Sequence, residues 1–155
     1  MLVEAIADED RSTRERAGSA LIRLGATAVE PLIRGLRSND REIARGSAFC
    51  LGLIGPAAAS ALPALVRNLH REEREVRAWA MIAICKIGPT TTDLRAIVDV
   101  LDDENRTVRR WAVKALGVLG QKAEGARSAI ERALDDESES VRNAAAEALE
   151  AITAG

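Results

Sequence analysis

Residues 105–120, NRTVRRWAVKALGVLG, carry the pattern that decides the fold. The stretch opens with an amide, continues with a β-branched residue and an arginine, and closes on Leu-x-x-Leu-Gly. Its apolar side chains fall 0, 4, 7, 8 and 11 residues after Val108, which places them on one face of an α-helix. Asn105 can cap the N-terminus of this helix and Gly120 can end it. The stretch therefore predicts an amphipathic helix with both ends marked.

The same pattern occurs five times along the chain. The β-branched residue near the start of each copy is Thr13, Ile43, Val76, Val108 or Val141. Four copies close on a glycine, at Gly25, Gly55, Gly88 and Gly120, and the fifth has Thr153 in that place. Shorter amphipathic segments precede the later copies, at residues 29–36, 61–69, 93–101 and 126–134. Each repeat is therefore predicted to be a pair of helices, a short first helix and a longer second helix.

The shared motif, Asp-x-x-Val-Arg-x-x-Ala-x-x-Ala-Leu-x-x-Leu/Ile-Gly, resembles the HEAT repeat family, specifically the short HEAT-like repeats found in phycobilin lyases. The resemblance covers essentially the whole chain. It implies an all-α, right-handed, armadillo-like α-solenoid of about five helix pairs forming one domain, 1–155. The expected repeats are about 1–25, 26–55, 56–88, 89–120 and 121–155. Aligning Ile6 and Asp10 with Leu36 and Asp40 predicts that the first repeat is truncated.

Charge and composition narrow the function classes. The 155 residues carry 22 basic and 24 acidic side chains, a net charge of −2, so a bulk nucleic-acid binder is not expected. The acidic N-terminal stretch 1–10 does not fit a signal peptide, so a cytoplasmic protein is expected. The uncharged stretch 46–66 is interrupted by Gly55 and Pro56 and is interpreted as helix, turn, helix rather than a membrane span.

Catalytic chemistry has little support in the sequence. His70 is the only histidine, and Cys50 and Cys85 have no paired spacing, so neither a metal site nor a cofactor is expected. Motifs for phosphate binding or nucleophilic catalysis are absent from the sequence. The repeated arginines at Arg14, Arg77, Arg109 and Arg142 are expected to form salt bridges between repeats.

In HEAT arrays the second helices line the concave face, so their outward positions are the candidate binding surface. Counting 100° per residue from the β-branched residue, these positions lie at offsets 2, 5, 6 and 9, with the tryptophans beside them at offset 3. The predicted partner-binding residues are Arg45, Phe49, Trp79, Met81, Ile82, Cys85, Arg110, Trp111 and Lys114. Aromatic residues, Met and Arg are favoured at protein interfaces. The alternative for the two tryptophans is simple packing between repeats.

Four functions remain open at this point. The leading hypothesis is a non-catalytic interaction module that holds a segment of a partner protein on the concave face, with Arg45, Arg110 and Lys114 orienting acidic groups. The resemblance also allows a bilin-lyase-like protein that binds a tetrapyrrole. A third hypothesis is a protein similar to the HEAT-like DNA glycosylases, although the expected strip contains no carboxylate. Self-association through the ends or the concave face is the fourth.

Overall fold

A computed structural model describes residues 1–154, and these contain helices but no strand. The second helices of the five repeats are α1 (Arg11–Leu24), α3 (Arg41–Ile54), α5 (Arg74–Ile87), α7 (Arg106–Leu119) and α9 (Glu139–Thr153). The first helices are α2 (Val29–Leu36), α4 (Leu62–Asn68), α6 (Leu94–Asp99) and α8 (Arg127–Arg132). Short 3-10 turns are η1 (Glu4–Ala7), η2 (Gly25–Ala28), η3 (Gly55–Ala61), η4 (Thr91–Asp93), η5 (Gly120–Ala126) and η6 (Ala133–Asp135).

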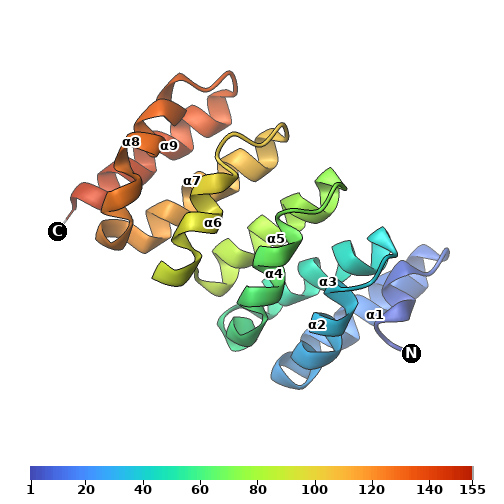
Figure 1. The fold of residues 1–155 in the computed structure, drawn as a ribbon. Coiled ribbons are helices and arrows are strands. Elements are labelled where there is room, and N and C mark those ends of the chain that lie inside the picture. Colours follow the sequence, from blue (N-terminus) through green and yellow to red (C-terminus); the bar gives the residue numbers. More distant parts are fainter. Residues whose placement is uncertain (155) are drawn as a thin grey trace. The chain divides into compact units, whose positions relative to one another are not determined.

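Each repeat is a helix pair, as the sequence predicts. Helices α2, α4, α6 and α8 each pack against the second helix that follows them. In the first repeat the four-residue turn η1 stands in the place of a first helix. The chain divides into two compact units, Met1–Ile87 with α1 to α5 and a second that begins at Gly88 with α6 to α9 (Figure 1). The organisation as a single domain stays a prediction.

The predicted helix ends are mostly confirmed. Asp10, Asp40 and Asn105 each accept a hydrogen bond from a backbone N–H in the first turn of the helix that follows. Ser138 makes no such bond, and its hydroxyl instead lies 3.0 Å from that of Ser140. The closing glycines Gly25, Gly55, Gly88 and Gly120 all have positive φ, a conformation that other residues rarely adopt.

Neighbouring second helices pack closely because small residues face each other. A side chain at Gly52 of α3 would lie 3.2 Å from the Cα of Ala83 in α5. In the second unit, Gly117 of α7 faces Ala148 of α9 with the same arrangement, at 3.3 Å. A second helix therefore packs against its own first helix and against the second helix of its neighbour.

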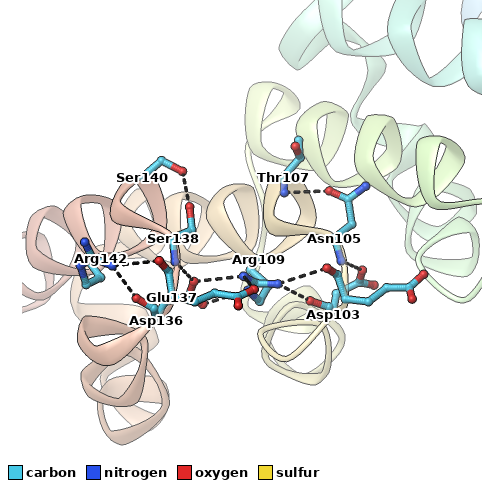
Figure 2. Close-up of polar contacts among 10 residues, drawn as sticks. Asp103, Asn105, Thr107, Arg109, Asp136, Glu137, Ser138, Ser140 and Arg142 are labelled. Atoms are coloured by element: carbon cyan, nitrogen blue, oxygen red, sulfur yellow. Dashed lines mark hydrogen bonds and ion pairs between the residues drawn. The ribbon is translucent and has the colours of Figure 1, made fainter.

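The repeated arginine holds the loop that precedes its own helix. Arg14, Arg77, Arg109 and Arg142 each direct Nη1 at two backbone carbonyls, those of the residues six and five positions earlier. For Arg109 these are the carbonyl oxygens of Asp103 and Glu104, at 2.8 and 3.3 Å (Figure 2). The arginine thus satisfies carbonyl groups that the turn leaves without backbone partners.

Arg109 also forms the expected bridge between repeats, from the fourth repeat to the fifth. The Nε and Nη2 atoms of Arg109 donate to both carboxylate oxygens of Asp136, at 2.8 and 3.0 Å, and Nη2 also reaches Glu137 at 3.1 Å. Burial raises the pKa of Asp136, but hydrogen bonds from Arg109 and the Ser138 backbone outweigh it and lower the pKa overall.

In the second repeat, a loop carbonyl is bound by an arginine from another repeat. The motif position of the second repeat holds Ala44, which is fully buried and has no guanidinium to offer. Arg71, from the loop of the third repeat, donates to the carbonyl of Ser38 at 3.1 Å, and Ser38 lies six residues before Ala44. The remaining nitrogens of Arg71 bind Glu73. The arginine is therefore supplied by the following repeat.

The segment Arg41–Asn68 is long and apolar enough, by length and composition alone, to cross a membrane. In the structure it comprises α3, η3 and α4, and the backbone leaves helical geometry at Ala58. Half of its most apolar window is buried within the protein. The break at Ala58 agrees with the interpretation as helix, turn, helix. Core helices that are largely buried in a protein meet the same criterion of length and composition.

Candidate functional site

An apolar hollow of about 520 Å³ crosses α1, α3 and α5 in the first unit, and we call it the aromatic hollow. Its apolar lining includes Ile22, Phe49, Leu53 and Trp79. Glycines at positions 18 and 46 line it too, and a side chain at position 46 would lie 3.0 Å from Ile6. Glycine at position 46 therefore leaves room for the Ile6 side chain at the lining of the hollow.

Phe49 and Trp79 form the aromatic wall of this hollow. Their ring centroids lie 5.1 Å apart and their planes are at 89°, an edge-to-face arrangement. Phe49 is 38% exposed and Leu53, one turn further along α3, is 44% exposed. Large apolar side chains are therefore held rigidly next to solvent, which is the composition of an interface anchor.

Arg45, at the polar edge of the hollow, is already paired within the protein. Arg45 donates two hydrogen bonds to the Glu42 carboxylate, at 3.1 and 2.6 Å. Arg45 and Trp79 also line an adjoining hollow of about 350 Å³. There the hydrogen bonds from Arg71 lower the pKa of Glu73 to about 2. Arg45 is expected to orient acidic groups of a partner, and in this structure its guanidinium is paired with Glu42.

In the second unit the cations gather around a tryptophan. The Arg110 guanidinium carbon lies 5.9 Å from the ring centroid of Trp111, and the Lys114 ammonium nitrogen lies 5.1 Å from it. Both distances are within the range of cation–π attraction. Arg110 also lines a polar hollow of about 700 Å³ with Arg106 and with residues at the start of α9.

The structure thus brings the predicted site residues together in two groups. Arg45, Phe49 and Trp79 share the aromatic hollow, whereas Arg110, Trp111 and Lys114 share one side of α7. Ile82 and Cys85 of α5 are half-buried and line neither hollow.

The exposure predicted for Met81 is wrong. Its side chain is fully buried, as are Ala48 and Val113 at the same offset of 5 in α3 and α7. A single helical wheel assigns one buried face to each second helix, but these helices also pack against their neighbours, as Gly52 does against Ala83. The second contact buries offset 5 and leaves a narrower exposed strip.

Sequence reasoning missed three exposed residues on this strip. Leu53 and Val118 occupy offset 10 in α3 and α7 and are 44% and 59% exposed. Arg106, at offset −2 in α7, is also exposed. Offsets −2, 2, 6 and 10 are four residues apart and therefore follow one side of the helix. Extending the count by one turn in each direction would have found all three.

The site offers few groups for chemistry. In residues 1–154 there is no cluster of three or more His, Cys, Asp or Glu side chains placed to hold a metal ion. Cys50 lies at the floor of the aromatic hollow, where burial raises its pKa to about 11 and keeps the thiol protonated at neutral pH. The arrangement is suited to binding apolar groups in the first unit and carries unneutralised positive charge in the second.

Comparison with known proteins places this geometry in a family. Residues 1–85 and 94–154 match the HEAT repeats model. No curated protein matches the chain.

Solved structures share the fold at low sequence identity. An engineered protein is 22% identical with a TM-score of 0.76, over 99% of this chain and 78% of that one. A designed armadillo repeat protein in complex with the peptide (KR)4 is 24% identical with a TM-score of 0.76, over 97% of this chain and 80% of that one. The complex of CpcE and CpcF of phycocyanin lyase from Nostoc sp. PCC7120 gives 23% identity and a TM-score of 0.79, over 98% of this chain and 64% of the matched chain. With its repeated helix pairs and a family match over most of its length, this chain belongs to the HEAT repeat family.

Proposed function

We propose that this protein is a non-catalytic interaction module that holds a segment of a partner protein in the aromatic hollow. The edge-to-face pair of Phe49, which is 38% exposed, and the half-buried Trp79 carries the proposal. Exposed aromatic side chains lose little conformational entropy on binding and supply much of the energy at protein interfaces. Neither ring needs to move to present its outer face, because each already packs against the other.

The family context supports the same function class. HEAT and armadillo-like folds are typical of protein-interaction scaffolds. One structural neighbour is a designed repeat protein with a bound peptide, and another is a complex of two proteins. The hollow measures about 520 Å³, which is room for a few apolar side chains rather than a whole domain.

Affinity capture from the native cell extract tests the proposal. The test variant is Phe49→Ala/Leu53→Ala, which removes the exposed apolar wall of α3. Leu134→Ala is the matched control, because Leu134 of η6 is 39% exposed but lies outside the hollow. Each variant is first shown to keep the helical circular dichroism and molar mass of the wild-type protein.

We expect a protein that the wild type and the Leu134→Ala control retain and the double variant loses. Titration of that purified protein would then quench or shift the fluorescence of Trp79, measured in a Trp111→Phe background. Equal capture by all three proteins would refute binding through the aromatic hollow.

One observation favours a second candidate, the binding of an open-chain tetrapyrrole. The structural neighbour from phycocyanin lyase shares this fold, and the hollow is apolar. Mixing the protein with bilin would shift the visible absorption band if the pigment binds, and Phe49→Ala/Leu53→Ala would abolish the shift. An unchanged spectrum would exclude this candidate.

A further inference from the structure

Three cations line one side of α7, and we call them the basic row: Arg106, Arg110 and Lys114. They are four residues apart, so they lie about 6 Å from one another along the helix axis. Arg110 and Lys114 both stand against the Trp111 ring, at 5.9 and 5.1 Å from its centroid. The ring limits the freedom of these two side chains and keeps their charges on the same side of the helix.

The basic row is not neutralised by the protein itself. Within residues 1–154, none of its three members forms an ion pair or a hydrogen bond through its side chain. Arg109, on the adjacent side of the same helix, binds both Asp136 and Glu137. Like charges four residues apart on a helix repel each other and destabilise it. An external anion bound to the basic row would reduce this repulsion.

The surroundings of the basic row restrict the kind of anion. On α9, the helix that packs against α7, the corresponding positions include Glu139 and Glu147, both exposed. Residues 88–155 carry nine basic and 13 acidic side chains, and 9 − 13 = −4. A long polyanion such as a nucleic acid would extend beyond the basic row into this negative field. A short acidic stretch can stay over the basic row, on the side of Arg106 and Arg110 away from Glu137 and Glu139, which line the same hollow.

An apolar residue completes the pattern. Val118 lies one turn beyond Lys114 on the same side of α7 and is 59% exposed. We infer that the basic row binds an acidic peptide segment of a partner protein, with its carboxylates over Arg106, Arg110 and Lys114 and an apolar side chain at Val118. This rests on the proposed function in one respect, because both take the second helices to be the binding face.

Direct titration with synthetic peptides tests this inference on the full chain. The probe is a short fluorescein-labelled peptide in which a run of glutamates precedes a leucine, in a background of glycine and serine. Matched peptides replace every glutamate by glutamine or by lysine. The protein variant is Arg110→Gln/Lys114→Gln. Its control, Lys122→Gln/Arg132→Gln, removes the same charge from exposed positions outside α7.

We expect the glutamate peptide to bind more tightly than both matched peptides, with an affinity that falls as salt is added. Arg110→Gln/Lys114→Gln should weaken binding about three- to tenfold, since each exposed ion pair contributes modestly. The control should change it by less than about twofold.

Three results would overturn the inference. The glutamine or lysine peptide could bind as well as the glutamate peptide, the two protein variants could bind alike, or a single-stranded oligonucleotide of equal charge could bind more tightly than the peptide. The outcome is separable from that of the aromatic hollow. If capture depends on Phe49 and Leu53 but the glutamate peptide does not bind, only the inference about the basic row is refuted. If the peptide binds but capture does not depend on Phe49 and Leu53, only the proposal for the aromatic hollow is refuted.

Discussion

Replacing Arg109 by methionine removes the most buried charge-assisted network of the second unit. The Arg109 side chain is 9% exposed, and its partner Asp136 is 12% exposed. Methionine keeps most of the side-chain volume but leaves the Asp136 carboxylate buried without its cation. Breaking one side of a buried pair costs about 3–5 kcal/mol, so the free energy of unfolding should fall by about that amount.

Urea unfolding followed by circular dichroism at neutral pH measures this loss. Arg14→Met is the matched control, because Arg14 occupies the same motif position but bonds only to the backbone carbonyls of Asp8 and Glu9, at an exposed site. It should cost about 1 kcal/mol. In Arg109→Met/Asp136→Leu the unpaired carboxylate is gone, so much of the stability should return. Equal losses for the two single arginine variants would refute the reasoning.

The same network predicts a pH dependence. The pKa of Asp136 in the folded protein lies below its ordinary value of 3.8, so its ionised form stabilises the folded state at pH values above that value. This contribution is lost as the pH falls through the lowered folded-state pKa. The difference in unfolding free energy between wild type and Arg109→Met should therefore shrink as the pH falls below the ordinary pKa of 3.8, compared with neutral pH. A difference that stays constant from neutral pH into acid would contradict this.

Three further predictions concern the first unit. Gly52→Leu should destabilise the protein by about 1–3 kcal/mol in urea unfolding, because any side chain there meets the backbone of Ala83 at 3.2 Å, and unchanged stability would contradict that close packing. Cys50, with its pKa raised to about 11, should react slowly with a thiol reagent at pH 8 and rapidly once urea unfolds the chain; fast reaction of the native protein would show that the thiol is accessible. The Glu73 carboxyl should titrate near pH 2 by NMR, and its stabilising effect, present above the ordinary pKa of 4.5, should fade between the two values; titration near 4.5 would show that Arg71 does not hold it in solution.

The fold could be predicted from the sequence because one short pattern recurs together with the residues that begin and end its helix. Gly25, Gly55, Gly88 and Gly120 fall where positive φ is needed, and the apolar stripe before each glycine fixes which side of the helix is buried. These signals are local, so they require no knowledge of neighbouring repeats.

The proposed binding surface was only partly predictable, because its limits depend on contacts between repeats. Phe49 is exposed as expected and Trp79 beside it is half-buried, but Met81 is fully buried. A helical wheel contains no information on neighbouring helices, so it does not show that Gly52 allows α5 to approach α3 closely. The carbonyl contacts of the repeated arginines were also missed. Their constant position after a short loop was the available signal. The acidic side chains nearby favoured the prediction of salt bridges instead of bonds to backbone carbonyls.

The bond between Arg71 and the Ser38 carbonyl has a consequence for how such a chain can evolve or be rebuilt. Four repeats carry their own loop arginine, so the loop carbonyls of these repeats would keep their donor if the repeat were moved. The loop of the second repeat would not, because Ala44 leaves it dependent on a residue of the third. Duplicating or transplanting the second repeat alone would leave the Ser38 carbonyl without its donor, whereas moving the second and third repeats together would preserve it. In this array the smallest transferable unit is in one place two repeats long.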